Sequence, residues 1–306
     1  MSFEKYLDIA PEIKEALANN KPVVALESTI LSHGFPYPEN KNFAKEVEVI
    51  VRAEGAIPAT TAIINGRLKV GLSEEELMFM CNPKDVGKVS RRDIATYIAT
   101  GKAGATTVAS TMMLASMAGI KVFATGGIGG VHRGGEDSMD ISADLQELAN
   151  TPVAVVGAGA KQLLDLGRTL EYLETMGVPV LGYQTEDFPA FYSRSSGHKL
   201  DYCCKDAEEV ARILHTKWDL GLKGGALIGN PIPKEYELDY DWMEGIITEA
   251  IALADEQGIK GKDTTPFLLA RIKELTEGVS FKSNVQLAYD NARVAAKIAA
   301  ELCKLG

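Results

Sequence analysis

The chain has 306 residues, of which 46% are hydrophobic and 24% are charged, with 29 glycines and 12 prolines. These proportions exclude a disordered chain, a collagen-like repeat and a coiled coil, and they leave enough apolar residues for a packed core. The 32 basic and 42 acidic side chains give a net charge of −10, which disfavours nucleic-acid binding but permits a local basic pocket for one phosphate.

The cysteines and the N-terminal residues favour a cytoplasmic protein. No Cys-x-x-Cys pair occurs, and the adjacent Cys203 and Cys204 cannot easily hold one metal ion, so we expect reduced thiols. The N-terminal residues MSFEKYLDIA lack the basic and apolar segments of a signal peptide. Residues 103–120 are uncharged but contain many Gly, Ser and Thr residues, so we expect them in a protein interior and not in a membrane.

Short apolar runs alternate with segments of helical periodicity along most of the chain. We expect a buried strand at residues 22–26, followed by a helix that begins near Pro38–Glu39 and ends at Gly55. The Asn65–Gly66 pair between apolar residues then predicts a two-residue β-hairpin.

Ser73 and Glu76 have the spacing of a helix capping box. Beyond residue 240 the pattern is mainly helical, with breaks at Gly258 and Gly278. Four further apolar runs predict strands, at residues 121–125, 152–156, 178–183 and 226–229. The pattern predicts an α/β fold: a three-layer α/β/α sandwich with a largely parallel, mixed central sheet and one hairpin. No linker or repeat interrupts it, so we expect residues 1–306 to form a single domain.

Polar or glycine-rich segments follow four of the expected strands. Ligands of open parallel sheets bind beyond the carboxyl ends of the strands, so we expect these segments to meet at one edge. The segments are residues 27–34, 126–135, 157–161 and 230–231. Their convergence predicts one functional site.

Six glycines lie within residues 126–135, beside His132 and Arg133. Backbone N–H groups of such a loop can bind an anion, and the alternative is a flexible surface loop. No Walker sequence ends the loop. In the later GAGAKQ segment, Gln162 stands where a dinucleotide fingerprint needs its third glycine, so a nicotinamide cofactor is poorly supported.

Asp140 and Asp144 are four residues apart and share a face if a helix begins there. Their oxygens suit a hard divalent ion such as Mn²⁺ or Mg²⁺, which often keeps several waters. The alternative is that they complement a helix dipole. Glu136 and Asp137 are expected to be solvated.

Lys161 follows a strand and a Gly-Ala-Gly-Ala turn, so we expect it to begin a helix at the edge of the sheet. Partial burial near a helix N-terminus disfavours the charged amine and suits a nucleophile, whereas most lysines simply lie on the surface.

Glu27 directly follows a buried strand, and burial would suit a general acid; the alternative is a structural carboxylate held by hydrogen bonds. Lys88 suits either phosphate binding or helix capping. His33, in a turn, ranks below His132.

Seven segments carry a family resemblance over residues 5–302. They are ALESTILSHGFPYPEN, VSRRD, TTVASTM, ATGGIGGVHRG, DISADL, GAGAK with RTLEYLET, and GNPIP. In this order they resemble the pseudouridine-5′-phosphate glycosidase, or indigoidine synthase A-like, family. The resemblance implies an enzyme that cleaves the carbon–carbon glycosidic bond of pseudouridine 5′-phosphate to uracil and ribose 5-phosphate, uses Mn²⁺ or another divalent ion, and forms a homotrimer.

The resemblance also implies roles for individual residues. Lys161 matches the nucleophile, Glu27 the proton donor and Asp140 the metal ligand. The implied substrate-binding positions are Lys88, Val108, Thr125, His132, Ser142, Ala143, Asp144 and Asn284.

Two residues depart from the family pattern. Gly157 stands where a cysteine or serine is expected, and Gly167 where proline is expected, so both could loosen the segment that carries Lys161. Two alternatives stay open: another imine-forming aldolase or lyase for sugar phosphates, and a nucleotide-binding protein without turnover.

Overall fold

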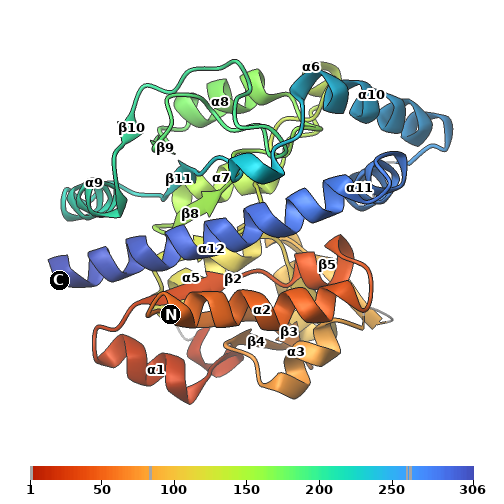
Figure 1. The fold of residues 1–306 in the computed structure, drawn as a ribbon. Coiled ribbons are helices and arrows are strands. Elements are labelled where there is room, and N and C mark those ends of the chain that lie inside the picture. The colour runs from red at the N-terminus through yellow and green to blue at the C-terminus, as the bar shows by residue number, and fades with distance from the viewer. Residues whose placement is uncertain (1–2, 83–84, 260, 262–263) are drawn as a thin grey trace.

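The structure is a computed structural model that describes residues 3–82, 85–259, 261 and 264–306. Within them an 11-stranded sheet forms the centre of the molecule (Figure 1). The strands are β1 (Leu7–Ile9), β2 (Val23–Leu26), β3 (Ile57–Ile64), β4 (Arg67–Val70), β5 (Val86–Val89), β6 (Ala103–Thr106), β7 (Val122–Ala124), β8 (Ala154–Gly157), β9 (Val180–Tyr183), β10 (Cys203–Cys204) and β11 (Ala226–Gly229).

Helices connect most of these strands. They are α1 (Pro11–Ala18), α2 (Glu39–Ala53), α3 (Glu74–Met80), α4 (Ile94–Ala99), α5 (Val108–Ala118), α6 (Gly135–Ser138), α7 (Ala143–Asn150), α8 (Leu166–Thr175), α9 (Ala207–Asp219), α10 (Tyr240–Glu256), α11 (Thr264–Leu275) and α12 (Val279–Leu305). The chain also forms short helical turns of other types: η1 (Phe3–Tyr6), η2 (Ile30–Gly34), η4 (Arg91–Asp93) and η5 (Lys234–Tyr236).

The strand order is β1-β4-β3-β2-β7-β8-β11-β9-β10, and β6 also pairs with β3 and with β5. All pairs from β3 through β2 to β10 are parallel, whereas β3 pairs antiparallel with β4 and β6. Strands β2, β8 and β11 are buried along their whole length, which explains why they appear in the sequence as continuous apolar runs. The predicted parallel, mixed sheet is therefore confirmed.

The predicted hairpin joins β3 and β4. Asn65 and Gly66 both have positive φ, at 51° and 69°, as the tight turn of a two-residue hairpin requires. The predicted capping box is also present, because the Ser73 side chain accepts from Glu76 N and the Glu76 side chain accepts from Ser73 N.

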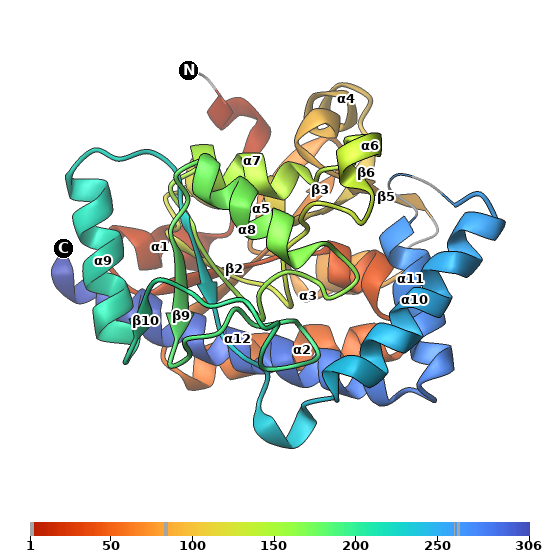
Figure 2. The ribbon, with the colours of Figure 1, turned by 90° about the horizontal axis from the view of Figure 1, so that it is seen from above.

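Helices cover both faces of the sheet (Figures 1 and 2). The long helix α12 crosses β2, β7 and β8 and packs against α2 and α9. On the opposite face, α5 packs on strands β2–β4, β6 and β7 and against α7, which in turn contacts α8. This arrangement is the predicted three-layer sandwich.

One large core cluster contains buried side chains from Ile13 of α1 to Ala299 of α12. A continuous sheet and core support the single-domain interpretation, which stays a prediction. Among the residues described, no helix has the length and apolar character needed to cross a membrane. The four cysteines are free thiols, in agreement with the sequence analysis.

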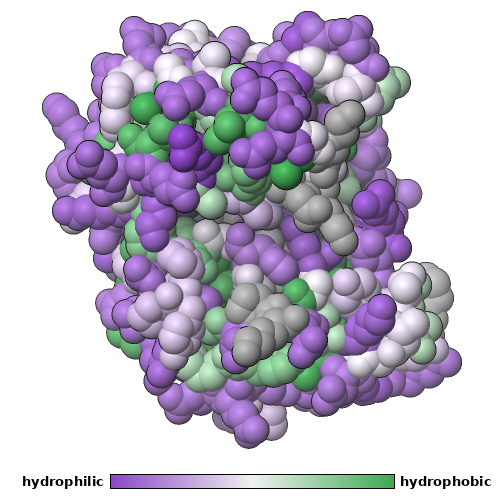
Figure 3. All heavy atoms as spheres, turned by 90° about the vertical axis from the view of Figure 1, so that its right-hand side faces the viewer, coloured by the Kyte–Doolittle hydropathy of each residue, from purple (hydrophilic) through white to green (hydrophobic). Residues whose placement is uncertain are grey.

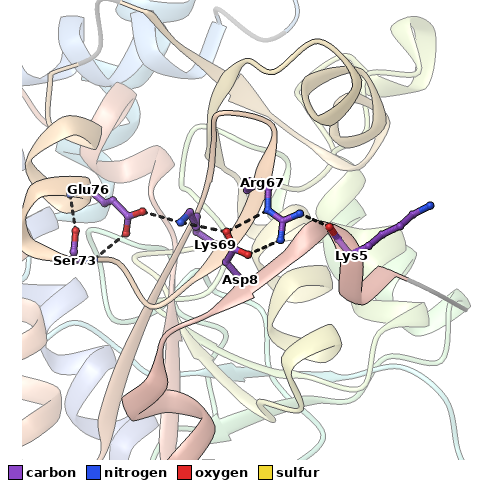
Figure 4. A network of polar contacts seen from close by, with 6 residues as sticks. All are labelled: Lys5, Asp8, Arg67, Lys69, Ser73 and Glu76. Carbon is purple, nitrogen blue, oxygen red and sulfur yellow. Dashed lines mark hydrogen bonds and ion pairs between the residues drawn. The ribbon is translucent and has the colours of Figure 1, made fainter.

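The α10 and α11 side of the molecule is hollowed near its middle, where hydrophilic residues are visible (Figure 3). Elsewhere, a polar network joins β1 to β4 and α3 (Figure 4). Asp8 binds Arg67 and Lys69, with Lys69 Nζ 3.3 Å from its carboxylate, and Lys69 also lies 2.9 Å from Glu76. This network attaches the edge strand β1 to the rest of the sheet.

Candidate active site

A cavity of about 870 Å³ lies beyond the carboxyl ends of β2, β5, β7 and β8. It opens toward the hollowed face of Figure 3. All the site residues that the sequence predicted line this cavity: Glu27, Lys88, Val108, Thr125, His132, Asp140, Ser142, Ala143, Asp144, Lys161 and Asn284. The fold thus brings together side chains that are separated by most of the chain.

Glu27 follows the last residue of β2 and lies close to Lys161. Burial raises the pKa of the Glu27 carboxyl, and this effect exceeds the opposing influence of the Lys161 charge and of the hydrogen bond that Thr125 Oγ1 donates to Glu27 Oε1. The raised pKa keeps a proton on this carboxyl at a higher pH than usual. The cavity therefore holds a candidate acid beside a candidate nucleophile.

Lys161 is half-buried, and its Nζ donates to the carbonyl oxygen of Gly127 at 3.0 Å. The prediction that Lys161 begins a helix was wrong, because α8 begins only at Leu166 with Asp165 as its N-cap. The residues just before Lys161 form bridges instead, Gly159 with Ala190 and Ala160 with Ile128. These bridges fix the backbone directly before Lys161, and the lysine itself lines the cavity.

The condition for a shared helical face of Asp140 and Asp144 is not met, because α7 begins only at Ala143 and Asp140 lies before it. Asp144 is buried, and its two oxygens accept from Ala109 N at 2.9 Å and from Gly129 N at 2.8 Å. Ala109 lies in the first turn of α5, so Asp144 caps that helix while it holds the glycine loop in place.

The glycine loop already uses several of its amides within the protein. Besides Gly129, the N–H groups of Ile128, Val131 and His132 donate to a backbone carbonyl or a threonine hydroxyl of this chain. These four amides are therefore not available to an anion. The glycine at 129 serves close packing instead, because a Cβ there would lie 2.4 Å from Ser142 Oγ.

His132 lies with its Nδ1 4.0 Å from a carboxylate oxygen of Asp140. Burial lowers the pKa of His132, the charge of Asp140 opposes this, and the charges of Lys161 and Lys88 lower it further. The imidazole is therefore neutral at pH 7. His132 therefore adds hydrogen-bonding capacity to the cavity, and the cationic side chains in its lining are lysines and arginines.

The donor set around Asp140 fits only a hydrated metal ion. Within the described residues, no three His, Cys, Asp or Glu side chains come together to hold a metal. Asp140 is about half exposed and projects one carboxylate toward the cavity. A divalent ion that keeps most of its waters needs no more than this.

Sequence reasoning missed two features of the cavity. The first is that Arg91 and Arg92 of η4 line the cavity, which the VSRRD segment alone could have indicated. Arg91 Nη1 lies 2.9 Å from the buried Glu147 carboxylate. The second concerns Asn284, which the sequence did identify. Its Oδ1 is buried and has no hydrogen-bond partner among the described residues, which the sequence could not show. A ligand N–H or O–H group at this place would remove the cost of that unpaired oxygen.

Gly157 tolerates a side chain in this structure. A Cβ there would lie 3.4 Å from Gly127 Cα and 3.5 Å from Thr125 Cγ2, which are ordinary contacts, and its φ is not positive. We therefore expect Gly157→Ala to stabilise the protein by about 0.4–1 kcal/mol, because alanine restricts the unfolded chain. Urea unfolding measures the change. Gly129→Ala is the matched control and should destabilise the protein, so a loss of stability in Gly157→Ala would contradict the expectation.

Comparisons with known proteins agree with this fold and site. Residues 12–301 match the family described as indigoidine synthase A like protein. A pseudouridine-5′-phosphate glycosidase from Clostridium botulinum is 61% identical over 303 residues, which are 99% of this chain and 99% of that protein.

Two solved structures are similar along nearly their whole length. The prealnumycin C-glycosynthase AlnA, in complex with ribulose 5-phosphate, has a TM-score of 0.91 and 39% identity, covering 98% of both chains. An indigoidine synthase A-like protein from Thermotoga maritima has a TM-score of 0.89 and 35% identity, covering 97% of this chain and 96% of that one. The chain is therefore an enzyme of the indigoidine synthase A-like family, the pseudouridine-5′-phosphate glycosidase family that its sequence motifs resemble.

Proposed function

We propose that this enzyme cleaves the carbon–carbon glycosidic bond of pseudouridine 5′-phosphate with water, giving uracil and ribose 5-phosphate. The reaction proceeds through an imine between Lys161 and the sugar, with Glu27 as the proton donor. The observation that carries the proposal is the pairing of Lys161 with the half-buried Glu27 carboxyl, whose pKa is raised, in one cavity. The 61% identical relative from Clostridium botulinum, named for this activity, supports the choice of substrate.

The difficulty of the reaction lies in its leaving atom. C5 of uracil is a poor carbanion, so simple departure of the base from the sugar is slow. Electron push from the uracil ring opens the ribose, the ring oxygen takes a proton, and C1′ becomes electrophilic. The nitrogen of Lys161 then forms a bond to C1′ through its lone pair.

Two protons are needed, one at the ring oxygen and one at C5 of uracil. Glu27 supplies one of them, and the nitrogen of Lys161 gives up the other once it has bonded to C1′. Uracil then leaves as the C1′–C5 bond breaks and the nitrogen lone pair forms the C=N bond. The imine that remains between Lys161 and C1′ is hydrolysed by water, which releases ribose 5-phosphate and restores the amine. A positioned proton donor contributes about 10²–10⁴-fold to the rate. Covalent capture divides one high barrier into two lower ones.

The remaining predicted residues bind and orient the substrate in this proposal. Lys88, with the neutral imidazole of His132 as a further donor, binds the phosphate. Asn284 and Thr125 contact the nucleoside. Asp140 holds a hydrated Mn²⁺ or Mg²⁺, which when bound supplies positive charge to orient polar groups of the substrate.

A second imine-forming reaction is the main alternative. AlnA was solved with ribulose 5-phosphate, which makes a lyase or aldolase acting on a sugar phosphate worth testing in parallel. A nucleotide-binding protein without turnover is the third possibility. The homotrimer that the family resemblance implies and the cytoplasmic location that the sequence favours belong to the same proposal.

Chromatography of the products distinguishes these functions. We expect purified enzyme to release uracil and ribose 5-phosphate from pseudouridine 5′-phosphate in equal amounts. Borohydride added with ribose 5-phosphate should reduce the imine and leave a mass adduct on Lys161. An adduct without uracil release would favour the other imine-forming enzyme, and the absence of both would favour the binding protein.

Asp140→Ala should reduce the dependence of turnover on divalent ions. Asp140 is half-exposed and makes no helix-capping bond like that of Asp144, so the fold should persist. Turnover measured across a Mn²⁺ titration checks this, with Asp137→Ala, an exposed acid close by in α6, as the control. Wild-type turnover that is unchanged in the presence of a chelator would contradict the metal proposal.

A further inference from the structure

The segment Thr125–Gly127, directly after β7, contacts both proposed catalytic groups. The Thr125 hydroxyl donates to Glu27, and the Gly127 carbonyl accepts from Lys161 Nζ at 3.0 Å. The position of this short segment therefore sets the position of the acid relative to the amine. Its two glycines have no side chains with which to hold it.

A buried asparagine of α12 fixes the same segment from the helical layer. Asn291 is fully buried, and its Nδ2 donates to Thr125 O at 2.8 Å and to Gly126 O at 3.1 Å. Its Oδ1 accepts from Asn230 Nδ2 at 3.0 Å, and Asn230 also donates to Asp290 at 2.9 Å. Every polar atom of the Asn291 side chain thus has a partner, which gives it one defined orientation.

We propose that Asn291 is a positioning residue for the reaction. It does not line the cavity, and it acts by holding Thr125 and Gly126 so that Glu27 and Lys161 keep their spacing. The inference rests on the proposed function, because it assigns Glu27 and Lys161 the roles given there. Displacements of about 1 Å at a reacting group can cost about 10²-fold in rate.

The structure also provides a control with the same local chemistry. Asn40 of α2 is buried, and its Nδ2 also donates to two carbonyl oxygens, those of Leu31 and Cys81, both at 2.8 Å. Neither carbonyl belongs to the segment that contacts Glu27 or Lys161. Asn40→Ala therefore reproduces the loss of a buried asparagine without the proposed effect on positioning.

The test compares Asn291→Ala with Asn40→Ala and wild type in pseudouridine 5′-phosphate turnover as a function of pH. We expect Asn291→Ala to lower kcat about 10²-fold with little change in KM. In the pH profile of kcat/KM, the alkaline limb of this variant should move to higher pH. The reason is that the hydrogen bond from Thr125, which lowers the pKa of Glu27, is loosened. Asn40→Ala should lower Tm without moving that limb.

Asn230→Ala is a second, milder variant. It keeps both hydrogen bonds that Asn291 donates but removes the one that Asn291 accepts from Asn230. It should show smaller effects of the same kind, and it replaces Asn291→Ala if that variant does not fold.

The outcomes separate this inference from the proposed function. One outcome is that wild type turns over while the alkaline limb of Asn291→Ala stays at the wild-type pH. In that case Asn291 has only a structural role and the inference is wrong, whether or not kcat falls. Wild type that releases no uracil contradicts the proposed function itself, and the positioning role falls with it.

Discussion

Replacing Lys161 with alanine should reduce turnover by about 10³-fold or more while the protein stays folded, because Lys88, the other lysine in the described lining of the cavity, is assigned to the phosphate and not to the imine. Lys161 is only half-buried, and among the described residues its side chain makes one hydrogen bond, to the Gly127 carbonyl, so truncation leaves no closed apolar void. Uracil release and Tm measure the two effects. Borohydride should label wild type and leave Lys161→Ala unlabelled.

Lys217 provides a matched control for this variant. Lys217 is buried, whereas Lys161 is half-buried, but like Lys161 it donates from Nζ to a backbone carbonyl, that of Lys223 at 2.5 Å, and it does not line the cavity. Burial lowers the pKa of this amine, and Lys217→Ala shows what the loss of a buried lysine outside the cavity does. Lys217→Ala should lower Tm and keep turnover. Full activity in Lys161→Ala would contradict the nucleophile assignment.

Glu27→Gln should lower kcat by about 10²–10⁴-fold and at the same time stabilise the folded protein. Burial raises the pKa of this carboxyl, so the folded state holds its proton more strongly than the unfolded state does. That contribution to stability is complete below the unfolded pKa and is lost as the pH rises through the raised folded pKa. Glutamine has no charge to bury, so the gain in Tm over wild type should grow from pH 5 to pH 8.

Glu48 is the matched control for the stability effect. Burial raises the pKa of this carboxyl as well, and it accepts a hydrogen bond from Thr60 Oγ1 at 2.7 Å, much as Glu27 accepts from Thr125. Glu48→Gln should raise Tm with the same dependence on pH but keep turnover. A Glu27→Gln variant that keeps wild-type kcat would show that Glu27 is not the proton donor.

Local signals were sufficient to predict the central strands of the sheet and its hairpin. Continuous apolar runs marked β2, β7, β8, β9 and β11, because strands buried on both faces contain few polar residues. The hairpin could be predicted because its turn needs two successive residues with positive φ. An Asn-Gly pair, here Asn65–Gly66, adopts this conformation more readily than most other pairs of residues. The small strands β5 and β6 gave no such signal, since β6 is the sequence Ala-Gly-Ala-Thr and is paired only through distant partners.

The details of the site depended on contacts that no sequence pattern shows. Asp144 looked like a metal ligand or a cap of its own helix, yet its partners are the amides of Ala109 and Gly129. The Lys161 segment looked like a helix start, but its bridges to Ile128 and Ala190 come from elsewhere in the chain. Asn291, within an alanine-rich helix, had no local signal, because its importance lies in two carbonyls that follow β7.

The order of strands in the sheet also has a consequence for how the chain acquires activity. Glu27 and Lys161 become neighbours only once β7 has inserted between β2 and β8, although long stretches of chain separate these strands. Closing such long loops is slow compared with forming helices, so refolding from denaturant should restore the circular-dichroism signal of the helices first. A refolding molecule that has regained its helices is therefore not yet a catalyst.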